Sequence, residues 1–273
     1  MTSKLFVATV LFFISSIVFL QKFAADEVVP VSDTGSLWLV NRDNPLSSCY
    51  KPENLVSYNG ILLQETARNA FVQMLNAMEQ DGVYGLQLQS AYRSYDYQQS
   101  VFSRKVQELM TGGYSQPEIT AAQSIQPAGS SEHQLGLALD VSMNGELTQS
   151  FGETRAGRWL EEHSHIYGFI IRYPISKTDI TQIVYEPWHL RYVGTPHSTI
   201  MKNLELTLEE YLSYIKEVQM YISWGEEMEY WLIIYTDTLS EILPQEAIVA
   251  VSSLNSTKSE YIVTKCKTYP GIW

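Results

Sequence analysis

Four residues in two short stretches of the chain are of the types that hold a metal ion. His133 and Asp140 stand seven positions apart in residues 130–142, a run that is otherwise mostly small and apolar. Burying a charged carboxylate costs several kcal/mol unless it is paired or bound to a metal. Glu186 and His189 follow downstream, in YEPWHLRYVG. Together these residues provide two imidazoles and a carboxylate as ligands and a second carboxylate to spare, which is the inventory of a catalytic zinc site.

The residue pattern of the first stretch indicates how its two candidate ligands are presented. Apolar residues at alternate positions predict a strand with one apolar face, and they are Leu135, Leu137, Leu139 and Val141. Asp140 falls on the other face of this strand, beside small residues. His133 would point the opposite way on a regular strand, so we predict that it lies before the strand, in a loop that turns back.

The second stretch places its two polar residues around a proline. Pro187 biases Glu186 toward an extended conformation. Strands are predicted on either side, at 180–185 and 190–193. We therefore expect a tight turn that brings Glu186 and His189 into one cavity.

An arginine upstream is expected at a junction between two elements. Residues 86–91 alternate in the manner of a strand, and Ser94 is a suitable cap for a helix reaching about Met110. Arg93 stands between them, at a position from which functional side chains often project. Gln98, one turn into the helix, could face the same direction.

The remaining pattern predicts a mixed α+β fold, with a mainly antiparallel sheet and helices packed on it. After Gly225 the chain becomes rich in β-formers, which predicts a small C-terminal β appendage at 223–273. His163, His165 and His197 are interpreted as structural or solvent-facing. Further helices are predicted at 64–80, 115–125, 155–166 and 207–220, and further strands at 37–40, 169–172, 230–235, 248–252 and 261–264.

Composition and charge limit the classes of partner. The chain has 273 residues and a formal net charge of -12, which argues against nucleic acid, because binding to it rests on neutralising phosphates with Lys and Arg. The two cysteines, Cys49 and Cys266, have no CxxC spacing and exclude a cysteine zinc ribbon. They are compatible with a disulfide in an exported domain or with two free thiols.

The first 25 residues read as an export segment. Residues 5–20 are apolar apart from Thr9, Ser15 and Ser16, with Lys4 before them, and the run is short for a spanning helix of about 20 residues. We interpret 1–25 as a signal peptide or an uncleaved N-terminal membrane anchor. Residues 26–222 then form the main domain, outside the cytoplasm.

Three blocks of sequence resemble a known family. SSEHQLGLALD contains the pattern S-x-H-x-x-G-x-A-x-D, and EPWHLRYVG and AYRSYDYQ accompany it. They resemble the VanY-type D-alanyl-D-alanine carboxypeptidases, which belong to a zinc metallopeptidase group that includes D-Ala-D-Ala dipeptidases and the hedgehog fold. The resemblance runs from about Leu37 to Tyr211 and implies the same α+β fold, with one Zn²⁺ at the open face of the sheet.

The resemblance also implies a role for each site residue. His133, Asp140 and His189 match the zinc ligands, and Glu186 matches the catalytic carboxylate. Arg93 matches the substrate-anchoring arginine of the catalytic site, and Ser131 and Gln98 match polar residues that line the substrate cleft. The implied partner is a peptidoglycan precursor or stem peptide that ends in D-Ala-D-Ala, met at the bacterial cell wall.

Three functions remain open at this point. The first is a zinc D,D-carboxypeptidase that releases terminal D-Ala. The second is an L,D-carboxypeptidase or wall endopeptidase on the same scaffold, since the ligand set does not determine the stereochemistry of the substrate. The third is a catalytically silent wall-binding module, because folds do not determine function. The presence of Glu186 speaks against the third, because a silent module has no need of that carboxylate.

Overall fold

A computed structural model describes residues 35–224, 229–237, 248–254 and 260–268 of the chain. Its helices are α1 (Glu65–Gln80), α2 (Tyr95–Thr111), α3 (Pro117–Ala121), α4 (Arg155–His163), α5 (Thr178–Thr181), α6 (His197–Leu204) and α7 (Leu208–Val218). Its strands are β1 (Leu55–Tyr58), β2 (Ile61–Gln64), β3 (Gln87–Ser90), β4 (Ala138–Ser142), β5 (Phe169–Tyr173), β6 (Glu186–Tyr192), β7 (Met220–Trp224), β8 (Glu229–Thr236), β9 (Ile248–Ser253) and β10 (Tyr261–Thr268).

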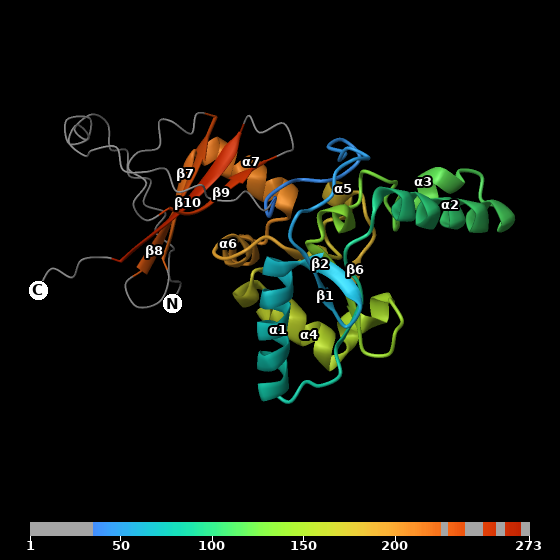
Figure 1. Ribbon diagram of the computed structural model, residues 1–273, viewed down its shortest axis with the longest axis horizontal. Coiled ribbons are helices and arrows are strands. Elements are labelled where there is room, and N and C mark those ends of the chain that lie inside the picture. Colours follow the sequence, from blue (N-terminus) through green and yellow to red (C-terminus); the bar gives the residue numbers. More distant parts are fainter. Residues whose placement is uncertain (1–34, 225–228, 238–247, 255–259, 269–273) are drawn as a thin grey trace, which may run out of the picture.

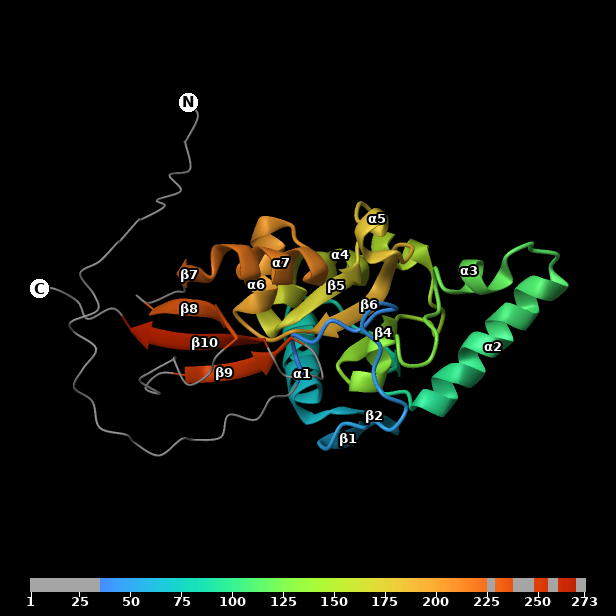
Figure 2. The same cartoon turned by 90° about the horizontal axis from the view of Figure 1, so that it is seen from above.

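Antiparallel pairing joins the strands into a hairpin and two four-stranded sheets. The hairpin is β1–β2, the central sheet has the order β3-β4-β6-β5, and the C-terminal sheet has the order β7-β8-β10-β9. Figure 1 and Figure 2 show the C-terminal sheet at one end of the molecule and the helices α2 and α3 at the other, with the central sheet between them. The α+β fold predicted from the sequence is confirmed.

The apolar face of the central sheet is buried against α1. Strand β4 places Leu139 opposite Leu190 of β6, and both side chains are fully buried. Phe71 and Met74 of α1 belong to the same core. Each such side chain contributes roughly 1.5–3 kcal/mol when it is removed from water, so this layer holds β4 in place with its other face toward the cavity described below.

The tight turn predicted between Glu186 and His189 is wrong, because both residues lie on the continuous strand β6. Residues three apart on a regular strand face opposite sides. The register between β5 and β6 moves from Ile171 opposite Leu190 to Tyr173 opposite Glu186. Strand β6 therefore carries extra residues at this point, a bulge that re-aims its side chains and brings Glu186 to the side of His189.

The strand predicted at 37–40 is also absent, because several backbone groups of this segment are hydrogen-bonded to side chains. Arg191 donates to the carbonyls of Gly35, Ser36 and Trp38 at 3.2, 2.9 and 3.0 Å. The amide of Leu37 donates to Ser252 Oγ at 3.2 Å. The segment is instead a buried connection between the central sheet and the C-terminal sheet.

Two further local predictions are wrong. The strand expected at 180–185 is replaced by the short helix α5, after which Gln182 adopts a left-handed conformation with φ of 60°. The helix predicted at 115–125 is shorter, because Pro117 begins α3, Gln116 is its N-cap residue and the helix ends at Ala121. Pro favours the first helical position, so the helix starts two residues later than predicted.

The starts of two other predicted helices are confirmed, although the second helix ends at Val218, before the predicted residue 220. Ser94 caps α2 by accepting from the amide of Tyr97, and Thr207 and Glu210 form the capping box of α7. The C-terminal sheet contains the three predicted β segments and begins earlier, at Met220. This sheet packs against α6 and α7, and Ile233 and Ile262 are buried in the second hydrophobic core that they form.

Two features of the chain lie partly or wholly outside the described residues. The predicted signal peptide or anchor at 1–25 is one of them. Among the residues that are described, no helix is long and apolar enough to cross a membrane. Cys49 is a free, exposed cysteine, so the structure does not contain the disulfide that the sequence left possible, and the side chain of Cys266 lies outside the description.

Candidate metal centre

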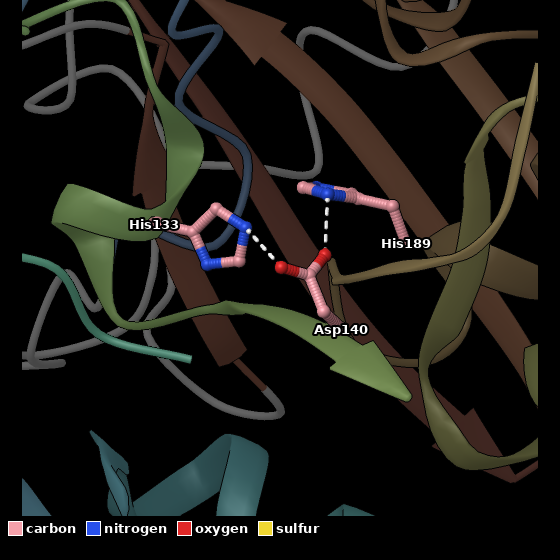
Figure 3. A group of neighbouring side chains, drawn as sticks. All are labelled: His133, Asp140 and His189. Atoms are coloured by element: carbon pink, nitrogen blue, oxygen red, sulfur yellow. Dashed lines mark ion pairs between the residues drawn. The ribbon is translucent and has the colours of Figure 1, made fainter. Parts of the chain in front are cut away.

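Two strands and one turn bring His133, Asp140 and His189 together (Figure 3). Their candidate ligand atoms all lie within 4.8 Å of one another, and all three side chains are buried. Nε2 of His133 lies 3.2 Å from Oδ2 of Asp140, and Nδ1 of His189 lies 3.1 Å from Oδ1. Asp140 and His189 are direct cross-strand partners in the β4–β6 pairing, so the sheet register sets this part of the site.

His133 reaches the cluster from outside the strand, as predicted. It lies in the 3₁₀ helix Glu132–Leu135, and Gly136 then turns the chain into β4 with φ of 71°. A Cβ on Gly136 would meet Leu55 Cδ2 at 3.0 Å. Glycine is therefore needed here both for its left-handed conformation and for its small size.

The hydrogen bond of His133 leaves its other nitrogen free for a metal. Its Nδ1 donates to the carbonyl oxygen of Ala91 at 2.6 Å. Burial, with the neighbouring Arg93, lowers the pKa of His133 to about 4, so the ring is neutral at ordinary pH. Nε2 then carries the lone pair that a metal ligand requires.

Asp140 is the shared carboxylate of the group. Although burial alone would raise it, His133, His189 and Arg93 hold the pKa of Asp140 well below its ordinary value. Nη2 of Arg93 lies 2.5 Å from Oδ2 of Asp140. Asp140 is therefore an ionised carboxylate between two imidazoles, and all three side chains are buried. Such a set of N and O ligand atoms fits Zn²⁺.

Glu186 lies beside the three candidate ligands. Its Oε2 is 3.7 Å from Nδ1 of His189, and its side chain is buried. Burial is the main reason that the pKa of Glu186 is raised to about 8. A carboxyl group with a raised pKa can accept and return a proton near neutral pH.

Arg93 and Gln98 form the wall of the same cavity. Nε of Arg93 donates to Ser90 Oγ at 2.9 Å, and its Nη1 lies 3.5 Å from Gln98 Oε1. Gln98, in turn, donates to the carbonyl of Gln126 at 2.6 Å. The guanidinium is thus held from two sides, and 17% of its side chain remains exposed toward the cavity.

All seven residues singled out from the sequence line one cavity of about 340 Å³. Ser131 lines it from the start of the 3₁₀ helix. Two histidines that were expected to be structural or solvent-facing lie outside this cavity. His163 stacks on Trp159 with ring centroids 4.7 Å apart, and His197 is hydrogen-bonded to Tyr211. The cavity is also lined by Tyr173, Trp188, Ile183, Leu147, Val101 and Lys105.

Sequence reasoning missed two groups at this centre. The ring of Tyr173 lies 4.9 Å from that of His189, and nothing in its sequence context indicated this. Glu132 is fully buried, and its Oε2 lies 3.9 Å from His189 Nε2. An acidic residue in a small and apolar run was the signal that selected Asp140, and the same argument applies to Glu132.

The mixed antiparallel fold, the His–Asp–His donor set and the adjacent buried glutamate define a metal-dependent hydrolase. A family model described as D-alanyl-D-alanine carboxypeptidase, VanY, matches residues 60–195. A D-alanyl-D-alanine carboxypeptidase of Enterococcus faecalis is 40% identical over 180 residues, which cover 65% of this chain and 66% of that protein. The chain spans slightly less than two thirds of this relative.

Two solved structures of carboxypeptidases are similar to this chain. A vancomycin-resistance D,D-pentapeptidase, VanY, solved in complex with Zn(II), is 40% identical, with a TM-score of 0.59 and coverage of 65% of this chain and 98% of that one. The LD-carboxypeptidase LdcB is 37% identical, with a TM-score of 0.59 and coverage of 66% and 86%. The chain belongs to the VanY D-alanyl-D-alanine carboxypeptidase family.

Proposed function

We propose that this chain is a zinc-dependent D-alanyl-D-alanine carboxypeptidase that removes the terminal D-Ala from peptidoglycan stem pentapeptides. The observation that carries the proposal is the placement of Glu186, a buried carboxyl group with a raised pKa, 3.7 Å from one of three converging candidate ligands. A binding module needs no such group beside its metal. We infer from the same substrate that the protein acts outside the cytoplasm, at the cell wall.

His133, Asp140 and His189 would hold the metal. Zinc supplies Lewis acidity and lowers the pKa of a bound water toward about 7. The β4–β6 register and the hydrogen bond from His133 to the carbonyl of Ala91 hold these side chains in place. A site that is already shaped in this way loses little conformational freedom on binding.

Glu186 moves the proton. It accepts a proton from the attacking water as the water oxygen adds to the scissile carbonyl carbon. It then delivers that proton to the nitrogen of the departing D-Ala as the C–N bond breaks. This exchange returns the carboxylate to its starting state, and burial raises the pKa of Glu186 to about 8, near the neutral range in which such a transfer is efficient.

Arg93 anchors and stabilises the substrate. Its guanidinium is a planar fork of donors that matches a carboxylate, and it lies against Asp140 at the metal side of the cavity. From this position it would hold the terminal carboxylate of the substrate or the oxyanion that develops at the scissile carbonyl. Ser131 and Gln98 supply further polar groups on the cavity wall.

Two stem peptides test the proposal. The full-length protein is incubated with a muramyl pentapeptide ending in D-Ala-D-Ala and, separately, with the corresponding tetrapeptide, and the products are followed by mass spectrometry. Loss of one alanine from the pentapeptide alone is the expected result. A chelator should abolish it, added zinc should restore it, and Glu186→Gln should lack it.

The same experiment separates the alternatives. Cleavage of the tetrapeptide instead of the pentapeptide would overturn the D,D assignment in favour of the L,D activity of the LdcB type. Stoichiometric zinc binding without cleavage of either peptide would overturn the enzymatic assignment and support a wall-binding module.

A further inference from the structure

Next to His133 lies an acidic side chain that the proposed reaction does not use. The Glu132 side chain has no exposed surface. Its Oε1 is 2.8 Å from Nε of Arg172 and 2.7 Å from Nη1 of Arg191, and both arginines are themselves buried. A carboxylate is tolerated at this depth only with such partners.

The second oxygen of the same carboxylate has a different surrounding. Oε2 of Glu132 and Nε2 of His189 are both buried, and neither has a hydrogen-bond partner within the described part of the chain. They lie 3.9 Å from each other. Leaving a buried acceptor without a donor is unfavourable, and the nitrogen of His189 is positioned to supply one.

The opposite ring nitrogen of His189 faces the candidate metal position. Nδ1 lies 3.1 Å from Asp140 Oδ1, within the ligand group. A histidine that ligates through one nitrogen usually gives the N–H of the other to a carboxylate or a carbonyl, which sets the tautomer and makes the ligand more basic. For His133 that partner is the Ala91 carbonyl. Among the described residues, the group that faces Nε2 of His189 is the carboxylate of Glu132.

We propose that Glu132 is a positioning residue that accepts the Nε2–H of His189 and thereby presents its Nδ1 to the metal. The inference rests on the zinc site of the proposed function. Arg172 and Arg191 hold the carboxylate of Glu132 in place through its other oxygen, because both guanidinium groups lie against Oε1. This pairing leaves Oε2 for the imidazole of His189.

The competing explanation is that Glu132 only neutralises the buried arginines. Glu209 offers a matched comparison, because it is the other carboxylate on Arg172, with Oε1 and Oε2 accepting from Nη2 and Nη1 at 2.7 and 2.9 Å. It has no contact with the three candidate ligands among the described residues. Removing its charge disturbs Arg172 without touching His189.

The test compares Glu132→Gln with Glu209→Gln in the full-length protein. Zinc affinity is measured by competition with a chromophoric chelator, and the ligand field by the visible absorption of the Co²⁺-substituted proteins. Glu132→Gln is expected to weaken zinc binding by about 10- to 100-fold and to change the Co²⁺ spectrum. Glu209→Gln should match the unsubstituted protein in both. Equal zinc affinity and equal spectra for the two variants would overturn the proposal.

A measurement on the unsubstituted protein covers the case in which Glu132→Gln does not fold. With ¹⁵N-labelled histidine and bound zinc, the Nε2–H proton of His189 should be shifted downfield and exchange slowly with water, as a proton held by a carboxylate does. Rapid exchange at the position of a free imidazole would overturn the proposal.

These readouts are independent of the substrate. If neither stem peptide is cleaved while Glu132→Gln still weakens zinc binding, the proposed function fails and the role of Glu132 stands. If the pentapeptide is cleaved and zinc affinity does not respond to Glu132→Gln, the role of Glu132 fails and the proposed function stands.

Discussion

Acidification is expected to weaken the junction between the C-terminal sheet and the helices α6 and α7, because a neutral histidine is buried there. Nδ1 of His197 lies 2.6 Å from the hydroxyl of Tyr211 on α7, and Nε2 lies 3.0 Å from Oγ1 of Thr264 on β10. Burial lowers the pKa of His197 from 6.5 to about 4. The folded protein therefore resists protonation at this position.

The sign and size of the effect follow from linkage. Because the pKa in the folded state is below that of the unfolded chain, the unfolded chain binds more protons between pH 6.5 and 4. The stabilising contribution is complete above pH 6.5 and is lost as the pH falls toward 4. The gap amounts to about 3 kcal/mol in total, of which about 2 kcal/mol is lost between pH 7 and pH 5.

The assay is urea unfolding of the full-length protein at pH 7 and pH 5, compared with His197→Gln. The variant keeps a hydrogen-bonding side chain and removes the titrating ring, and other titrating groups cancel in the comparison. The free energy of unfolding should fall between the two pH values by about 2 kcal/mol more in the unsubstituted protein than in the variant. Equal losses in both would refute the assignment of this pH dependence to His197.

Three further predictions concern the metal centre and the turn that forms it. Glu186→Gln should lower kcat by about 10²- to 10⁴-fold while metal analysis still finds one zinc per chain, and a rate within a few-fold of normal would remove Glu186 from the role of base. Arg93→Lys keeps the charge and loses the donor fork, so kcat/KM for the pentapeptide should fall by about 10²-fold, and an unchanged value would show that the guanidinium does not meet the substrate. Gly136→Ala should lower the free energy of unfolding by about 1–2 kcal/mol from its φ of 71° alone, and by more because Leu55 lies 3.0 Å from the new Cβ. Gly60→Ala is the control for the backbone conformation without crowding, since its φ is 86° and no atom would lie within 4 Å of the added Cβ. Equal losses in the free energy of unfolding for the two variants, measured by urea unfolding, would contradict the crowding argument.

Much of the centre could be predicted because it depends on local patterns. The alternation that puts Leu139 on one face of β4 necessarily puts Asp140 on the other. The seven-residue separation then requires His133 to lie outside the strand, and the 3₁₀ helix and Gly136 provide the required turn. Local periodicity was sufficient at these positions.

The errors arose where a distant partner decides the local structure. The bulge that aligns Glu186 with His189 appears only in the register with β5. The sequence at 37–40 is typical of a strand, but Arg191, more than 150 residues away along the chain, donates hydrogen bonds to the carbonyls of Gly35, Ser36 and Trp38. The interaction of Glu132 with His189 was missed for a similar reason, since it depends on how the 3₁₀ helix packs against β6.

The buried segment at residues 35–39 is hydrogen-bonded to both the central sheet and the C-terminal sheet. Its Leu37 amide and Trp38 ring nitrogen donate to Ser252 and Ser253 of β9, and its carbonyls accept from Arg191, which also contacts Glu132. A chain shortened before Met220 would keep every candidate ligand and lose these acceptors. Loss of the sheet would affect Arg191 through this segment. The C-terminal sheet is therefore expected to stabilise the metal centre, although none of its described residues lines the cavity.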